Sequence, residues 1–441
     1  SNKITGSSTS NKFVAKMAAS SKILYRYSFD QTTGGFWLDT KPQEVIVPIP
    51  SGETVNYIYA NDYITQFDSF KSYPWTGLNN INLPLLEELD LSYLTNIPAS
   101  DFFFGGVYDA KNKIGLKSIK KLNLSNVRLT GATAEAYTLN VSDCTKLQEL
   151  DISYSSITKV TLSDDAALTT YNLAGTAITS LELKNQAFLT TLILDNCTKL
   201  TSITIENCNK LSFINLPPNV QTVTITNCAL LSSISLPYVS INNSISLLRG
   251  VSIDNCPALK SFDISGQNNP ELAIELVGAP NLEILNLQGT ATTNLLLPSL
   301  FVNGVPNFNS LRDVNISRTN YTAFKYNDNQ TLDYLDLSYF PNLDNLKAVD
   351  AKQLVRVKCT NDLDNPINLE LGSFLNCSAL ERIEGNFNLL GAEVFRKCSN
   401  LVLNTEEIYA SNGTNFILGE GVTNISIDAS VTSLFSCFEG C

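Results

Sequence analysis

The sequence of 441 residues contains no histidine. Histidine is the usual general base and the commonest metal ligand at neutral pH, so its absence removes Ser-His and Cys-His nucleophile pairs. The sequence also lacks a Gly-rich phosphate loop, a G-x-S-x-G elbow and an H-E-x-x-H zinc motif. A glycosidase that uses two carboxylates needs no histidine, but nothing in the sequence favours one. We expect a protein that is not an enzyme and needs no cofactor.

Long apolar runs are absent too. No stretch of about 18 apolar residues occurs, so the sequence predicts no transmembrane helix. The net charge is −12, and the acidic excess lies in residues 81–441. An acidic chain of this kind repels nucleic acid and anionic membranes. We expect neither as a partner.

The ten cysteines show no C-x-x-C zinc pattern and no paired spacing typical of a disulfide framework. Most of them follow short apolar strands, often directly after Asn or Asp, and we expect buried free thiols there: Cys144, Cys197, Cys208, Cys228, Cys256, Cys377 and Cys398. Two carboxylate pairs, Asp164/Asp165 and Asp362/Asp364, are candidate metal ligands. The second pair lacks the Gly and distal Glu of an EF-hand loop, and we expect no metal site.

What the sequence does contain is a repeated phrase, L-x-x-L-x-L-x-x-C. It occurs at Leu189, Leu192, Leu194 and Cys197, then again at Leu200, Ile203, Ile205 and Cys208, and variants end at Cys228 and Cys256. Alternating apolar residues predict a short strand with one buried face. The polar residue and cysteine after it predict a corner. One coil cannot bury its own apolar face, so neighbouring coils must stack.

The regular coils place apolar strand positions at Leu150, Tyr171 and Leu192, about 21 residues apart, with half-coil strands between them. So short a coil leaves little room for an outer α-helix, and we expect few helices. After residue 236 the intervals lengthen, which predicts loops on one side.

These phrases resemble leucine-rich repeats over roughly residues 80–441. The later segments 372–387 and 393–403 carry F-x-x-C-x-x-L. The segment FINLPPNV at 213–220 is similar to I-x-I-P-x-x-V, the second half of the same type of repeat. This combination resembles the surface-antigen type of repeat, called BspA-like, of Bacteroidetes and their phages. The resemblance implies a mainly β solenoid, an irregular leucine-rich repeat with parallel strands, and adhesion to a host protein or glycan.

Residues 1–80 are not repetitive, and we expect a small β-rich module there that caps the solenoid or attaches it to a larger assembly or surface. The pattern predicts a short helix at 13–23 and a hairpin at 44–60. Residues 63–70 are typical of a degenerate first coil. The solenoid itself is expected over residues 81–441, and its last phrase stops at Cys441, so we expect the chain to continue or a partner to cover that end.

Candidate binding residues come from two patterns. A polar stripe between the buried strand positions predicts a recognition face at Asp90, Asn123, Asp151, Asn172, Asn286, Asn315 and Asp336. Aromatic residues in or beside insertions predict exposed contacts at Tyr321, Phe324 and Tyr334. The alternative for the stripe is a solvated sheet face with good turn chemistry, and for the aromatics it is anchoring of loops.

The function that we expect is non-enzymatic binding or adhesion through an extended surface, on a bacterial cell or outside it. An alternative is a tail or head fibre of a phage virion, favoured by the absence of a visible signal segment, the Ser-initial chain and the incomplete last repeat. A carboxylate-based polysaccharide-cleaving enzyme is a third hypothesis.

Overall fold

The computed structural model describes backbone and side chains over residues 86–93, 115–131, 137–164, 167–236, 246–299, 307–327, 333–359, 366–387 and 393–402. It describes the backbone alone of the remaining strands. The chain divides into two compact units, Ser1–Leu211 (unit 1) and Ser212–Cys441 (unit 2). All the regular elements among the described residues are strands. No helix that could cross a bilayer is found in this part of the chain.

Unit 1 begins with an antiparallel sheet in the order β4-β3-β6-β1-β8. Its strands are β1 (Asn2–Gly6), β3 (Ser21–Arg26), β4 (Phe36–Thr40), β6 (Tyr57–Ala60) and β8 (Trp75–Asn79). A second sheet has the order β21-β19-β17-β14-β10-β7-β2-β5. It contains β2 (Lys12–Met17), β5 (Glu44–Pro48), β7 (Ile64–Phe67), β10 (Glu88–Asp90), β14 (Lys121–Asn123), β17 (Glu149–Asp151), β19 (Thr170–Asn172) and β21 (Thr191–Ile193).

Three local expectations for the N-terminal module can be checked. The helix predicted at 13–23 is wrong, because these residues contribute to β2 and β3, in which backbone hydrogen bonds to other strands replace those of a helix turn. The hairpin predicted at 44–60 is also wrong: β5 pairs with β2, whereas β6 pairs with β1 and β3. The first coil at 63–70 is confirmed, since β7 pairs in parallel with β10. The division of the chain at residue 80 stays a prediction.

From β10 onward, unit 1 alternates between two rows of parallel strands. The second row of unit 1 contains β16 (Thr138–Asn140), β18 (Lys159–Thr161), β20 (Ser180–Lys184) and β22 (Ser202–Glu206). Strands β11 (Ile97–Pro98) and β15 (Leu129–Thr130) form a separate parallel pair. A small parallel sheet joins β9 (Ile81–Asn82), β12 (Phe104–Gly105) and β13 (Ile114–Gly115). Leu150 pairs in register with Tyr171, and Tyr171 pairs with Leu192, which confirms the 21-residue coil.

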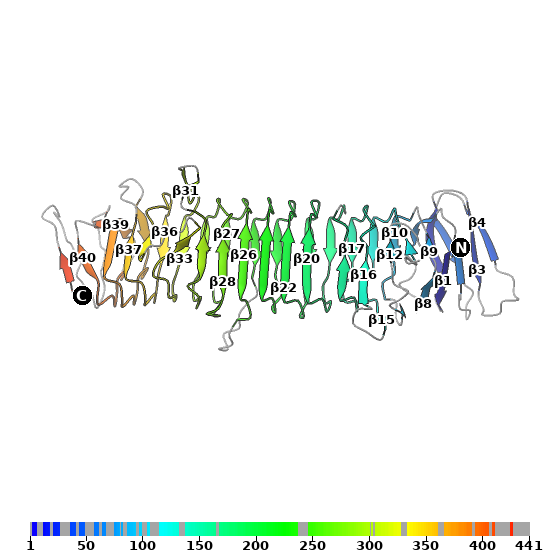
Figure 1. The fold of residues 1–441 in the computed structure, drawn as a ribbon, viewed down its shortest axis with the longest axis horizontal. Coiled ribbons are helices and arrows are strands. Elements are labelled where there is room, and N and C mark those ends of the chain that lie inside the picture. Colours follow the sequence, from blue (N-terminus) through cyan, green and yellow to red (C-terminus); the bar gives the residue numbers. More distant parts are fainter. Residues whose placement is uncertain are drawn as a thin grey trace. The chain divides into compact units, whose positions relative to one another are not determined.

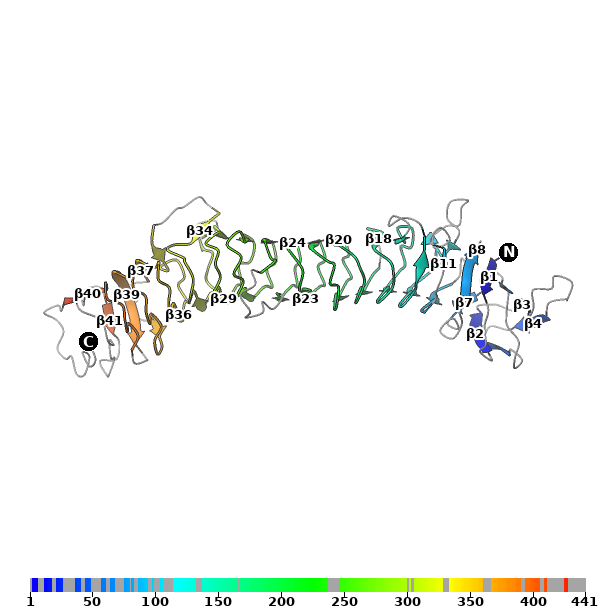
Figure 2. The ribbon, with the colours of Figure 1, turned by 90° about the horizontal axis from the view of Figure 1, so that it is seen from below.

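Unit 2 has the same plan. One row contains β23 (Phe213–Asn215), β25 (Ser233–Ser235), β27 (Ser261–Asp263), β29 (Ile284–Asn286), β33 (Asp313–Asn315), β36 (Asn345–Lys347), β38 (Ile367–Leu369) and β39 (Arg382–Leu389). The other contains β24 (Thr222–Thr226), β26 (Gly250–Asp254), β28 (Ala273–Leu276), β30 (Leu295–Leu297) and β34 (Lys325–Tyr326). Strand β35 (Leu335–Asp336) pairs with β37 (Arg356–Lys358), which pairs with β39. Figure 2 shows β24 and β34 along one side of this unit and β23 and β29 along the other.

Five short strands complete unit 2. Strands β31 (Phe301–Val302) and β32 (Val305–Pro306) form an antiparallel pair. Strand β41 (Ile408–Ala410) pairs with β39, and β40 (Val402–Asn404) pairs with β42 (Asn424–Ser426). Figure 1 shows β26 and β28 as neighbouring arrows that run in the same direction.

The core lies between the two rows, because alternate residues of each strand point inward. In β20 the burial alternates from exposed Ser180 to buried Leu181 and onward. The corner cysteines complete this core. All eight cysteines in the described residues are buried free thiols, as predicted for the seven at corners. The Sγ of Cys377 donates to the carbonyl of Ala348 at 2.9 Å, and Cys398 donates to Phe374 at 3.0 Å. Each thiol therefore satisfies a carbonyl inside the bend.

These features confirm the predicted fold, a β-solenoid of the leucine-rich-repeat type that follows a β-rich N-terminal module. The parallel register of successive coils follows directly from the repeated phrase.

Candidate functional site: a polar hollow on the sheet of unit 2

The candidate site lies on the outer face of the row β27-β29-β33-β36-β38. In register, Leu285 faces Val314, which faces Leu346, and all three are buried. The residues on either side of each buried position therefore point outward. They form two columns across the coils: Ile284, Asp313, Asn345 and Asn368 in the first, and Asn286, Asn315, Lys347 and Glu370 in the second.

Between these columns is a shallow hollow of about 230 Å³. Its outward-facing lining is four amides, two carboxylates, one ammonium and the side chain of Ile284, which is 41% exposed. Lateral hydrogen bonds hold the groups in place. The Asn345 amide donates to Asp313 at 2.9 Å, and the Asn315 amide donates to Gln288 at 3.2 Å. The Nζ of Lys347 lies 4.0 Å from the Oε2 of Glu370, and each side chain is about half exposed.

The seven residues of the predicted polar stripe share a structural role. In all seven, one side-chain oxygen accepts a hydrogen bond from the backbone N–H two residues on, at 2.8–3.2 Å. This bond ends the strand and starts the turn. The residues are Asp90, Asn123, Asp151, Asn172, Asn286, Asn315 and Asp336.

The structure brings some of these residues together. Asp90, Asn123, Asp151 and Asn172 lie side by side in register in unit 1, and the Asn172 amide donates to Asp151 at 3.1 Å. Beside this row, Lys121 forms an ion pair with Glu149 at 3.0 Å, and this hydrogen bond raises the pKa of the Lys121 ammonium. Asn286 and Asn315 lie in the hollow of unit 2. A role in binding stays a prediction for all six.

Asp336 does not stand beside Asn286 and Asn315 on the row β29-β33-β36. The expected polar stripe is wrong at this position. The buried Val314 pairs with Leu346, so the phrase at residues 342–348 takes the next place in the row. Strand β35, which carries Asp336, pairs with β37 instead. Asp336 is only 4% exposed, and its carboxylate accepts bonds from the N–H and the hydroxyl of Ser338.

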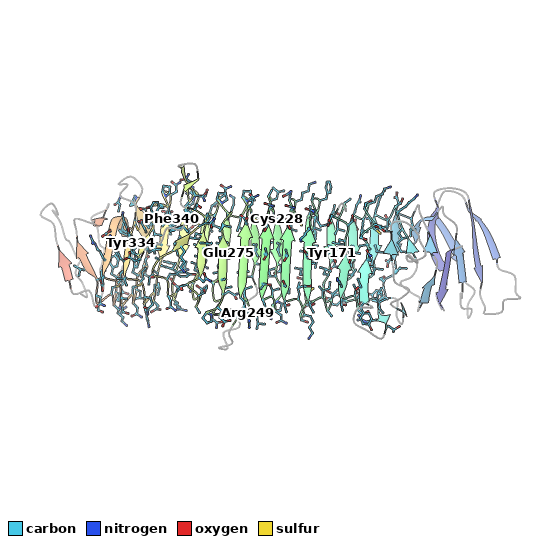
Figure 3. All side chains as sticks on the ribbon, in the orientation of Figure 1. Tyr171, Cys228, Arg249, Glu275, Tyr334 and Phe340 are labelled. Carbon is cyan, nitrogen blue, oxygen red and sulfur yellow. The ribbon has the colours of Figure 1, made fainter. Side chains whose placement is uncertain are left out.

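Two of the three predicted exposed aromatics are buried, which corrects that expectation. Tyr321 is 1% exposed and Phe324 is 2% exposed, and their rings pack edge to face at 5.8 Å. Burial raises the pKa of the Tyr321 phenol. Both residues lie in the long coil between β33 and β36, and burial of their rings removes apolar surface from water. Tyr334 is partly exposed, and the Arg356 guanidinium lies over its ring at 4.2 Å. Figure 3 labels Tyr334 on this unit together with Phe340, which is fully buried.

The residues of the hollow that sequence reasoning missed are Asp313, Asn345, Lys347, Asn368 and Glu370. A usable signal existed, because Asp313 stands two residues before Asn315 and must point to the same face of the strand. The strand phrase at 342–348 was not recognised as part of the row, so Asn345 and Lys347 were not assigned to it.

Among the residues that the structure describes, no group of three or more His, Cys, Asp or Glu side chains is arranged to hold a metal ion. The hollow can offer hydrogen bonds of both senses and one ion pair. Asp313 carries a second carboxylate oxygen beyond the one that accepts from Asn345. This arrangement can bind a polar ligand on a rigid surface.

No protein-family model matches the sequence, and no curated protein matches it. Among solved structures, the chain is similar to a leucine-rich repeat protein from Bacteroides ovatus ATCC 8483, with 14% identity and a TM-score of 0.19 over 79% of this chain and 92% of that one. It is also similar to the functional domain of InlJ from Listeria monocytogenes, which includes a cysteine ladder. There the identity is 16% and the TM-score 0.23, over 75% of this chain and 65% of that one.

Proposed function

We propose that this protein is a non-enzymatic binding protein that recognises a glycan, free or carried on a host protein, at the polar hollow of unit 2. The observation that carries the proposal is the lining of that hollow. Amides both donate and accept hydrogen bonds, and carboxylates accept them. A sugar hydroxyl also does both, so a surface of closely spaced amides and carboxylates complements a hydroxyl-rich ligand.

The position of these groups supports recognition of an extended partner. They stand on strands rather than loops, and rigid elements hold binding groups more accurately than loops do. The hollow is smaller than the cavities of roughly 300–1,000 Å³ that take small molecules, and seven of its eight outward-facing side chains carry an amide, a carboxylate or an ammonium group. Ile284 adds one exposed apolar surface, on which the C–H face of a sugar ring can rest.

The place of action is part of the proposal. Adhesion at a bacterial surface and attachment within a phage virion both use such a face, and both stay predictions, as does attachment of the N-terminal module to a larger assembly. Purification of the protein from its source, followed by native mass spectrometry, would distinguish a large particle from a monomeric or cell-wall species.

The direct test is a glycan array probed with the full chain, followed by titration of the glycans that bind. Asp313→Ala and Asn345→Ala are expected to weaken binding by roughly tenfold each, because each removes a hydrogen-bonding group worth about 1.5 kcal/mol to a ligand. The matched control is Thr224→Ala, an exposed position on β24 in the other row of the same unit. Binding that survives both variants unchanged would rule out the hollow as the site.

A further inference from the structure

A second exposed feature lies at one corner of unit 1 and is separate from the hollow. Five corner residues of successive coils stack there through backbone hydrogen bonds, and we call them the corner row: Tyr93, Asn126, Tyr154, Gly175 and Asn196. The N–H of each of the first four donates to a carbonyl in the corner of the next coil, at 2.7–2.9 Å. The corner row therefore presents, in order, a ring, an amide, a ring, a glycine and an amide.

The two tyrosines occupy a backbone conformation that suits them poorly. Tyr93 has a φ of 65° and Tyr154 has a φ of 53°. The same conformation is taken in this row by Asn126, Gly175 and Asn196, which are the residue types that accept it at least cost. A bulky residue in the left-handed region costs of order 1 kcal/mol, and such strain concentrates at functional sites. Two tyrosines at alternate corners are therefore an observation that points to use of their rings.

The Tyr154 ring packs against Gly175 of the next coil. A Cβ built on Gly175 would lie 2.3 Å and 2.4 Å from two ring carbons of Tyr154, so the ring lies directly over the glycine. The Asn196 amide reaches the phenol oxygen at 3.4 Å, and the Arg128 guanidinium donates to the Tyr154 carbonyl. One side of the ring is thus supported by the next coil. The side chain nevertheless stays open, because Tyr154 is 46% exposed and Tyr93 is 57% exposed.

The spacing of the two tyrosines along the row points to a ligand class. Tyr93 and Tyr154 stand two coils apart, which is roughly 9.5 Å at the usual separation of neighbouring strands. Alternate sugars of an extended β-linked polysaccharide repeat at a similar distance and present the same face. Asn126 occupies the corner between the two tyrosines in this row.

We propose that Tyr93 and Tyr154 form a stacking platform for an extended chain of β-linked hexopyranoses, with Asn126 and Asn196 as the polar contacts. This inference rests on the proposed function in so far as the ligand is a glycan. It adds a second site, on the corner rather than on the sheet face, and it specifies the linkage geometry. A rigid aromatic ring supplies a large contact area at low cost in conformational entropy.

The test replaces each tyrosine with the residue that the same row uses elsewhere. Tyr93→Asn and Tyr154→Asn, singly and together, remove the rings but keep a residue suited to positive φ. We expect the double variant to melt at the same temperature as the parent or higher, because strain is relieved. We expect its affinity for β-1,4-linked oligosaccharides of glucose, mannose or N-acetylglucosamine, measured by calorimetry with the full chain, to fall by at least tenfold.

The two proposals fail in different ways. If the double variant binds these oligosaccharides as tightly as the parent while Asp313→Ala weakens binding, the corner platform is overturned and the hollow stands. If the tyrosine variants lose binding and the hollow variants do not, the platform stands and the hollow fails. If the parent binds no glycan on the array and none of the oligosaccharides, both are overturned. Tyr154→Phe is expected to retain binding, and a loss equal to that of Tyr154→Asn would contradict stacking as the mode of contact.

Discussion

The side-chain amide of Asn255 donates a hydrogen bond of 2.7 Å to the side-chain oxygen of Asn227, its counterpart in the previous coil. Both residues have positive φ, at 49° and 55°, and each precedes a buried corner cysteine. The Asn207 amide makes the same bond to Asn185, at 2.8 Å. Asparagine thus does two things at these corners: it tolerates the left-handed backbone, and it links one coil to the next.

Substitutions at Asn255 separate these two contributions. Both variants lose the lateral hydrogen bond, but Asn255→Gly removes the Cβ from a backbone at positive φ, whereas Asn255→Ala keeps the Cβ without the side-chain amide that helps Asn to accept this conformation. We expect Asn255→Gly to lower the free energy of unfolding by about 0.5–1.5 kcal/mol and Asn255→Ala to lower it by about 1 kcal/mol more. Urea unfolding followed by circular dichroism measures both. Equal losses for the two variants would show that the backbone conformation contributes nothing.

Among the glycines of unit 2 that the structure describes, Gly278 is the one at which a side chain has least room. A Cβ there would lie 1.9 Å from the backbone nitrogen of Asn255, so the neighbouring coil would have to move. We expect Gly278→Ala to destabilise unit 2 by about 2–4 kcal/mol, as for overpacking at a rigid contact. Gly250→Ala is the matched control, because its Cβ would meet only one atom, at 3.9 Å, and its φ is not positive. That variant should be neutral or more stable by about 0.5 kcal/mol.

The buried aromatics of unit 2 give a third prediction. Tyr321→Ala and Phe324→Ala each empty an aromatic site in the core, and we expect losses of about 3–5 kcal/mol in the free energy of unfolding. Tyr334→Ala removes a partly exposed ring under Arg356 and should cost less, about 1 kcal/mol. Thermal unfolding monitored by circular dichroism ranks the three. If Tyr334→Ala were the most damaging variant, the assignment of Tyr321 and Phe324 to the core would be wrong.

Periodicity was enough to predict the coil, because burial alternates with position in most of its strands. The register of Leu150, Tyr171 and Leu192 and the burial of the corner cysteines follow from that rule. What periodicity does not determine is the path of a coil that carries extra residues. Tyr321 and Phe324 lie where the spacing of the repeats is irregular. The neighbouring residues do not indicate whether their rings are buried in the coil or exposed on its surface.

The candidate site shows the same limit. Asn286 and Asn315 were found because they follow the buried strand residue in a recognised phrase. Asn345 and Lys347 belong to a strand whose phrase begins about ten residues after a similar one, at LDYLDL. Both phrases fit the pattern of the row equally well, and only tertiary pairing chooses between them. The corner row was missed because Tyr93 and Tyr154 replace Asn and so break the motif by which corners are recognised.

We expect the buried corner thiols Cys144 and Cys208 of unit 1 to make the folded chain less stable at alkaline pH. Burial raises the pKa of Cys144 to about 12 and that of Cys208 to about 11, from an ordinary value of 9.0. A raised pKa in the folded state means that the folded form favours the protonated thiol. The stabilisation is fully present below pH 9. It is lost as the pH rises from 9 toward 11 or 12, because only the unfolded chain releases the proton in this range.

The measurement is urea unfolding of the parent chain and of Cys208→Ala, in the presence of a reductant, on both sides of pH 9. Tyrosine and lysine residues titrate in the same range, so the decisive quantity is the difference between the two slopes of stability against pH. Cys208→Ala should be less stable than the parent at neutral pH, because a buried side chain is truncated, yet lose less stability between pH 9 and about 11. Parallel curves would mean that Cys208 releases its proton as readily in the folded chain as in the unfolded one, which its burial at a closed corner does not allow.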